Sequence, residues 1–175
     1  MGDFMAFFLP VFKRLNDAKV RYVVVGGVAT ILHGYVRATT DIDLIVDLQV
    51  GEAEKVIRVL AHAGYQPYAP VDATAFAQPD QRNHWIESKG MTVFALFHPD
   101  QPGLSIDLFI THPIPFDELW ERSVVFDVGG TNIRACAIDD LIKLKNIAGR
   151  KRDQDDIEKL RKIKAYGKRS EKPHN

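Results

Sequence analysis

Two aspartates, Asp41 and Asp43, lie two residues apart in an apolar stretch at positions 41–46. The alternation of polar and apolar residues predicts a β-strand in which both carboxylates point to one face, while the residues between them point into a core. Neighbouring carboxylates repel each other unless a cation lies between them. Hard oxygen ligands at this spacing suit Mg²⁺ or Mn²⁺. The pair is therefore a candidate metal site.

A pair of glycines, Gly26 and Gly27, precedes this strand, and thirteen residues separate Gly27 from Asp41. The apolar run 22–25 predicts a buried strand before the glycines, and residues 28–32 predict a short helix after them. Free backbone N–H groups and the positive end of a helix suit a phosphate group. A phosphate-binding turn beside a divalent-metal site indicates nucleoside triphosphate chemistry.

A third aspartate, Asp107, interrupts another strand-like run at positions 104–110. The apolar residues of this run share one face, which leaves Asp107 on the other face with Ser105 and Phe109. A lone charge in an apolar strand is costly if it is buried. Asp107 is thus either an aspartate on the solvated face of the strand or a third metal ligand.

These motifs resemble the nucleotidyltransferase superfamily that includes DNA polymerase β. They are more closely similar to small bacterial nucleotidyltransferases of the abortive-infection toxin type, and the similarity covers roughly residues 20–160. The matching residues are Gly26-Gly27, His33-Gly34, Arg37-Ala-Thr39-Thr-Asp41-Ile-Asp43, Lys145, Gly149-Arg150, Asp153 and Asp156-Ile157.

The resemblance implies an α+β protein with the polymerase β-like nucleotidyltransferase fold, in which helices flank a mixed, twisted sheet and further helices form the C-terminal part. It implies that the catalytic, metal-binding residues are Asp41, Asp43 and Asp107, with Mg²⁺ or Mn²⁺ as the cofactor. It also implies that an NTP such as ATP is the substrate, and that its binding residues are Gly26, Gly27, Arg37, Thr40 and Lys145. Transfer of NMP to a hydroxyl group would release pyrophosphate.

Several of these positions have a second interpretation. Arg37 could pair with Asp47 or another acid, and Lys145 could lie on a solvated helix surface. His33 could be a general base, but a histidine at a helix end is more often structural. Many members of the superfamily have Gly-Ser where this chain has Gly27, so a phosphate-binding hydroxyl is missing here.

The acceptor is not evident from the sequence, and three classes of function remain open. The chain could be a toxin-like enzyme that modifies RNA or a protein and is neutralised by an antitoxin. It could instead modify an antibiotic, an aminoglycoside or a lincosamide. A non-catalytic nucleotide-binding regulatory protein is the third possibility, although such a protein has little physical reason to keep three carboxylates together.

The chain has 175 residues, of which 46% are hydrophobic, as is typical of a globular protein with a buried core. The single cysteine, Cys136, lies in an apolar run and is expected in the core; it excludes an internal disulfide framework. No apolar stretch approaches the ~20 residues of a membrane span, and the N-terminus lacks the basic segment of a signal peptide. We therefore expect a cytoplasmic protein without membrane contacts.

The net charge is zero, but it is unevenly distributed. Residues 1–140 contain 11 Lys and Arg against 18 Asp and Glu, a net charge of −7, whereas residues 141–175 contain 12 against 5, a net charge of +7. The basic segment could place cations near a triphosphate or an RNA. It could equally be the solvated surface of a helix.

The remaining sequence predicts one domain at 1–165, with helices at 138–165, and a disordered basic tail at 166–175. A helix containing Pro10 is expected at 4–18, another helix at 52–63, an edge strand at 65–69, a loop at 70–82 and a hairpin of strands 84–88 and 92–97. Further on, a short helix at 116–122 and a hairpin at 124–137 are expected. The stretch 127–134 resembles a phosphate motif of sugar kinases, but too few residues follow it to build that domain, so a hairpin turning at Gly129 and Gly130 is the better interpretation.

Overall fold

The computed structural model describes residues 2–170, and within this range the strands form one seven-stranded mixed sheet. Its order is β3-β4-β5-β2-β1-β7-β6. The strands are β1 (Tyr22–Val25), β2 (Asp41–Val46), β3 (Gln66–Pro67), β4 (Val93–Phe97), β5 (Ser105–Phe109), β6 (Val124–Val128) and β7 (Thr131–Ala135). The helices are α1 (Gly2–Asp17), α2 (Gly26–Leu32), α3 (Val50–His62), α4 (Pro79–Lys89), α5 (Phe116–Arg122), α6 (Ile138–Ala148) and α7 (Lys151–Ser170), with a 3₁₀ helix at Ala73–Ala77.

The centre of the sheet brings together segments that are far apart in the sequence. Strand β2 pairs antiparallel with β1, which places Asp43 opposite Val25, and parallel with β5, which places Asp43 opposite Asp107. The aspartate strands are therefore direct neighbours. The turn from β1 into α2 lies at the same end of the sheet.

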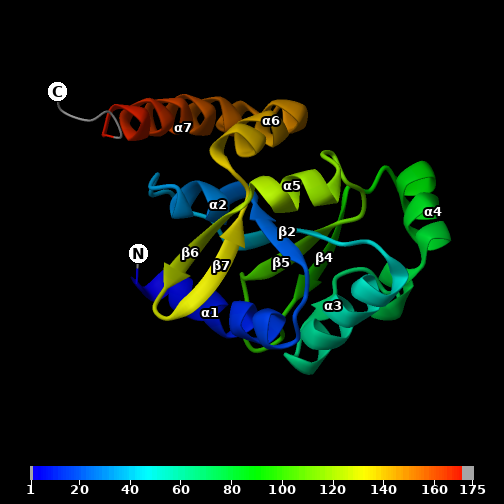
Figure 1. Ribbon diagram of the computed structural model, residues 1–175. Coiled ribbons are helices and arrows are strands. Elements are labelled where there is room, and N and C mark those ends of the chain that lie inside the picture. The colour runs from blue at the N-terminus through cyan, green and yellow to red at the C-terminus, as the bar shows by residue number, and fades with distance from the viewer. Residues whose placement is uncertain (1, 171–175) are drawn as a thin grey trace.

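Helices cover both faces of the sheet. All four residues of β1 are buried, and Figure 1 shows α1 and α3 on one side of the sheet and α2 and α5 on the other. On β2 and β5 the apolar residues alternate with the acids: Ile42, Leu44, Ile106 and Leu108 are fully buried. This alternation confirms the predicted faces, and it explains why these strands can carry carboxylates without placing them in the core.

Helix α1 passes through Pro10 without a break. Phe8, Phe12 and Leu15 recur at helical spacing and are fully buried. Pro10 is exposed, so its ring points away from this apolar contact. The predicted edge strand is also present, because β3 contains Pro67 and pairs on one side only, with β4.

The predicted hairpin at 84–97 is wrong, because its first strand belongs to α4, which also takes up the end of the predicted loop. Pro79 occupies the first turn of the helix, where its missing N–H costs nothing. Gly90 ends the helix in the left-handed conformation, with φ of 61°. Arg82 and Trp85 are buried on one side of the helix, and Trp85 stacks on Phe94 with 5.2 Å between the ring centroids.

The C-terminal part is helical as predicted. Helices α6 and α7 pack side by side at one end of the molecule, next to α2 (Figure 1). Helix α7 extends to Ser170, five residues into the segment predicted as a tail, and positions 171–175 lie outside the described residues. None of the helices within residues 2–170 is long and apolar enough to cross a membrane.

Candidate active site

Three carboxylates converge at the centre of the sheet. Oxygen atoms of Asp41, Asp43 and Asp107 all lie within 4.8 Å of one another. Asp41 and Asp43 are on one face of β2, and Asp107 is opposite Asp43 on β5. The structure thus brings together the three residues that the sequence singled out as metal ligands.

The three negative charges in this cluster repel one another. Burial, together with the negative charges of Asp41 and Asp107, raises the pKa of Asp43 to about 7. Burial also raises the pKa of Asp107, with a second contribution from Asp41. A divalent cation would remove this repulsion, and carboxylate oxygens are the ligands that Mg²⁺ and Mn²⁺ prefer. The residues present therefore fit a divalent metal.

Asp41 is oriented by the residues that precede it. The hydroxyl group of Thr39 donates a hydrogen bond of 2.8 Å to Asp41 Oδ1, and the backbone N–H of Thr40 donates one of 3.3 Å to the same oxygen. The Thr40 residue is exposed. Thr39 was not among the predicted site residues, although it lies in the Arg-x-Thr-x-Asp pattern.

The two glycines allow the backbone to approach the acids closely. Gly26 has φ of 62°, and a Cβ atom there would lie 1.9 Å from Asp43 Oδ2. A Cβ atom at Gly27 would lie 2.5 Å from the Thr39 hydroxyl oxygen. A hydrogen bond from the Gly27 backbone N–H to Asp43 opposes the rise in the pKa of that carboxyl. Thr39 thus occupies the space that a serine at position 27 would need.

We expect Gly26→Ala to disrupt the site more than the fold. The added methyl group must displace the Asp43 carboxylate, and the left-handed backbone adds strain, so we expect a loss of about 1–3 kcal/mol in stability and a fall of at least about 100-fold in transfer rate. Thermal unfolding and pyrophosphate release measure the two effects. Gly90→Ala is the matched control, because Gly90 has φ of 61° and open space around its Cβ position. Equal loss of activity in both variants would contradict the steric explanation.

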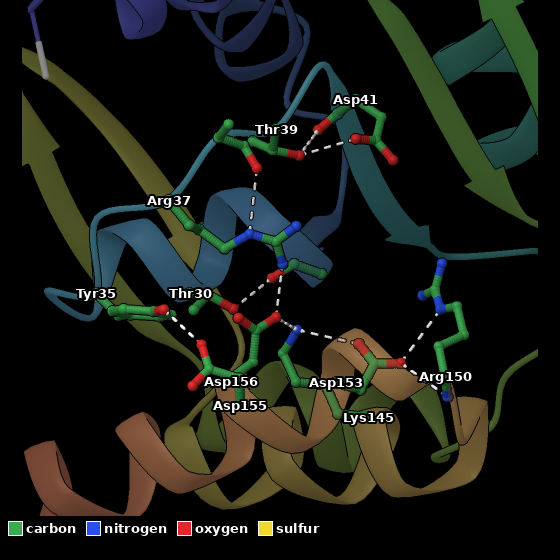
Figure 2. A network of polar contacts seen from close by, with 12 residues as sticks. Thr30, Tyr35, Arg37, Thr39, Asp41, Lys145, Arg150, Asp153, Asp155 and Asp156 are labelled. Atoms are coloured by element: carbon green, nitrogen blue, oxygen red, sulfur yellow. Dashed lines mark hydrogen bonds and ion pairs between the residues drawn. The ribbon is translucent and has the colours of Figure 1, made fainter.

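A second group of charges joins the C-terminal helices to the loop before β2. In this C-terminal ion-pair network, Asp156 on α7 accepts from Arg37 at 2.5 Å and from Lys145 at 2.6 Å. Lys145 also lies 3.6 Å from Asp153. Figure 2 shows the side chains of Arg37 and Lys145 meeting at the Asp156 carboxylate. The side chains of Lys145, Asp153 and Asp156 are each 5% exposed or less.

This network bears on two of the predicted nucleotide-binding residues. Arg37 does pair with an acid, but with Asp156; Asp47 pairs instead with Arg21. Lys145 lies between α6 and α7 rather than on a solvated surface. Arg37 joins the loop that leads to Asp41 to α7, and Lys145 joins α6 to α7. Contacts of either cation to a nucleotide remain a prediction.

Arg150, at the turn between α6 and α7, is a functional candidate that the sequence did not identify. Its Nε atom donates to Asp153 at 3.2 Å, and its side chain is 55% exposed. The charge of Arg150 lowers the pKa of both Asp43 and Asp107. In Figure 2 its guanidinium group points away from α7 toward the strand that carries Asp41. It is an exposed cation that faces the carboxylate cluster.

His33 makes structural contacts. Its Nε2 atom lies 2.7 Å from the carbonyl oxygen of Cys136, and its ring meets Phe126 edge-on. Burial lowers the pKa of His33, so the ring is neutral near pH 7. Cys136 is fully buried, as expected for a core residue.

Several solved structures share this architecture. The lincosamide antibiotic adenylyltransferase LnuA, solved with lincomycin, aligns with a TM-score of 0.59 and 16% identity over 93% of this chain and 98% of its own. ANT(2'')-Ia, solved with adenylyl-2''-tobramycin, aligns with a TM-score of 0.56 and 11% identity over 95% and 97%. An antigenic nucleotidyltransferase-like protein from Paracoccidioides brasiliensis gives 0.60 and 14% over 92% and 75%. No curated protein matches the sequence.

The fold and the acidic cluster together define the chain as a nucleotidyltransferase of the polymerase β-like fold, which confirms the predicted fold class. The sequence model of the aminoglycoside-2''-adenylyltransferase family matches residues 8–96, just over half of the chain. The chain belongs to this family.

Proposed function

We propose that this nucleotidyltransferase moves NMP from an NTP to a hydroxyl group of a small cationic acceptor, with Mg²⁺ or Mn²⁺ bound by Asp41, Asp43 and Asp107. The observation that carries the proposal is the convergence of these three carboxylates within 4.8 Å beside the Gly26-Gly27 turn. Two metal ions bound there would stabilise the attacking and the leaving oxygen of an in-line displacement.

The protein groups have distinct parts in this reaction. Asp107 accepts the proton of the acceptor hydroxyl, whose oxygen forms a bond to the α-phosphorus while the bond to the β-phosphate breaks and pyrophosphate leaves. The glycine turn provides a close approach for the phosphates. Arg150, which faces the carboxylates, supplies a cation that binds the triphosphate. Arg37 and Lys145 pair with Asp156, and the Thr40 backbone N–H donates to Asp41. We keep these three residues in the proposal as groups that contact the nucleotide.

The family and the charge of the body support an aminoglycoside or a lincosamide as the acceptor. The matching family is that of an aminoglycoside adenylyltransferase, and one structural neighbour was solved with lincomycin. The body of the chain, residues 1–140, has a net charge of −7, which favours a cationic acceptor. ATP is the expected nucleotide.

A second candidate acceptor is RNA, as for a toxin whose antitoxin partner would block it. The observation that favours it is the basic surface of α7, where Lys151, Arg152 and Arg161 are exposed. Clustered cations of this kind contact nucleic acid backbones.

The first test is calorimetric titration with each NTP, with and without Mg²⁺ or Mn²⁺. We expect metal-dependent binding of one NTP by the wild type and none by Asp41→Asn/Asp43→Asn, because the double variant loses two of three ligands. Pyrophosphate release is then measured with aminoglycosides, lincosamides and small RNAs. Pyrophosphate release with RNA, but with no aminoglycoside or lincosamide, would identify RNA as the acceptor. Metal-dependent NTP binding by the double variant would contradict the assignment of the site.

A further inference from the structure

A cavity lined by charged residues lies away from the carboxylate cluster. It has a volume of about 810 Å³ and lies between α1, the start of β1, α5 and the β6–β7 hairpin. Tyr22 lines it and pairs with Val46, at the end of β1 and β2 opposite to Val25 and Asp43. The cavity and the acids are therefore at opposite ends of the same strands.

Cations dominate the walls of this cavity. Lys13, Lys19, Arg21 and Arg134 line it, whereas Asp17 is the one carboxylate among the lining residues that the structure describes. These are four of the 11 Lys and Arg in residues 1–140, a segment with a net charge of −7. The cavity wall is therefore basic, although the segment that forms it is acidic as a whole.

Most of this positive charge is not neutralised. Arg21 is paired with Asp47 and Asp117, both at 2.7 Å. By contrast, no described carboxylate lies within ion-pair distance of Lys13 or Lys19. Two exposed lysines that line the cavity and have no ion-pair partner among the described residues favour an anionic ligand.

Arg134 is fixed in place without a carboxylate. It donates a hydrogen bond of 2.7 Å to the Ser123 hydroxyl and lies 4.1 Å from the centre of the Trp120 ring. It is therefore an oriented guanidinium whose charge remains available to the cavity.

The backbone at Lys19 is unusual for a lysine. Its φ is 53°, the one positive φ of a non-glycine residue within 2–170. Lys19 follows the last turn of α1, where its N–H bonds to Asn16 and that of Val20 bonds to Leu15. This pattern is the helix ending at which glycine is the usual residue. A lysine in this conformation has a strained backbone, and it adds a basic side chain to the cavity wall.

The opposite wall is rigid. The β6–β7 turn has two glycines in the left-handed region, Gly129 at 59° and Gly130 at 80°, which makes a tight two-residue hairpin. Next to it, the Asn16 side chain donates to the carbonyl oxygen of Asn132 at 2.7 Å and accepts from the Tyr22 hydroxyl. The hairpin is thereby tied to α1, so the cavity is preorganised.

From these observations we propose that this cavity is a second binding site, for a small molecule that carries a phosphate or pyrophosphate group. Its volume lies within the range of small-molecule pockets. Phosphate groups bind well to a combination of ammonium and guanidinium groups. A small ligand is favoured over nucleic acid because the acidic body would repel a long polyanion. The site is independent of the proposed function of the carboxylates.

Calorimetric titration of the full chain at low ionic strength tests the site, with sodium pyrophosphate and AMP as probes. EDTA keeps divalent metals out of the carboxylate cluster. We expect at least one probe to bind the wild type, and Kd to rise about tenfold or more in Lys13→Ala/Lys19→Gly. Lys89→Ala, which removes an exposed lysine at the end of α4 outside the cavity, is expected to bind like the wild type. Equal binding by wild type and the double lysine variant, or no binding in the millimolar range, would overturn the proposal.

The single variant Lys19→Gly separates binding from structure. Glycine accepts the left-handed backbone, so the melting temperature should rise while probe binding weakens. A rise in melting temperature with unchanged binding would overturn the role of Lys19 in the site. Lysine-dependent binding of a single-stranded RNA oligonucleotide, without binding of either probe, would overturn the small-molecule ligand in favour of nucleic acid.

Discussion

Asp43→Asn is expected to lower the transfer rate by on the order of 10³-fold while making the metal-free protein more stable. Asp43 is the carboxylate that lies opposite Asp107 and beside Asp41, so its charge is central to metal binding. An amide is a poorer ligand for Mg²⁺ than a carboxylate, so the variant should bind the metal weakly. Without the metal, the negative charge of the triphosphate is not compensated. Pyrophosphate release with the identified acceptor measures the loss. Asp100→Asn, an exposed acid in a turn, is the control and should keep the wild-type rate.

The stability gain follows from the pKa of Asp43. Its pKa in the folded protein is raised to about 7 from the ordinary value of 3.8 for an aspartate. The folded state therefore binds more protons than the unfolded state between these values, and the free energy of unfolding falls as pH rises from about 4 to about 7. Above pH 7 the whole cost is present, on the order of 4 kcal/mol. Asparagine removes this charge and with it this part of the pH dependence.

Chemical denaturation in EDTA at pH 5 and pH 8 measures this effect. The wild type should be less stable at pH 8 than Asp43→Asn, and the difference should shrink at pH 5. Adding Mn²⁺ should stabilise the wild type and have a much smaller effect on the variant. A variant that is less stable than the wild type at pH 8 would show that Asp43 is a structural residue and not a strained ligand.

Lys145→Met is expected to destabilise the protein by about 3–5 kcal/mol, because it leaves the buried carboxylates of Asp153 and Asp156 without their shared cation. Part of the charge of Asp156 is still compensated by Arg37. The double variant Lys145→Met/Asp156→Asn should therefore be less destabilised than the sum of the two single variants. Thermal and denaturant unfolding provide these values.

The exposed pair of Lys162 and Glu158 on α7 supplies the control. Its side chains are 60% and 61% exposed, so Lys162→Met should leave the melting temperature nearly unchanged. If Lys145→Met also left the melting temperature unchanged, the ion pairs of Lys145 would not hold α6 against α7. Calorimetric titration of NTP to Lys145→Met then decides whether Lys145 also binds the nucleotide.

The sequence predicted the centre of this molecule better than its edges, and the reason is physical. The alternation of acids with Ile42, Leu44, Ile106 and Leu108 reflects strands with one apolar face, so both the strands and the orientation of the carboxylates could be predicted. Residues 79–89 have no such signal. Their helix buries only Arg82 and Trp85, and a mostly polar segment with an apolar pair resembles a short strand.

The partners of the charged residues could not be predicted from local spacing. Arg37 and Asp156 are 119 residues apart, and the choice between Asp156 and Asp47 depends on how α7 folds back over α2. Arg150 was noted only as part of the matching C-terminal motif, because nothing in the sequence shows that the α6–α7 turn lies near the carboxylates. Such contacts are set by topology and not by local pattern.

The pairing of β2 with β5 also determines when, during synthesis of the chain, the protein can first bind an NTP. Asp43 and Asp107 are 64 residues apart, and the two strands are parallel, so their pairing requires closure of a long loop and is expected to form late in folding. The contact from Arg37 to Asp156 spans just over two thirds of the chain. A nascent chain emerging from the ribosome can form α1 and β1 early, but it cannot complete the acidic cluster before β5 emerges. We expect the NTP-binding conformation to appear only when α7 has been synthesised, which makes the C-terminal helix the last step in assembling the active site.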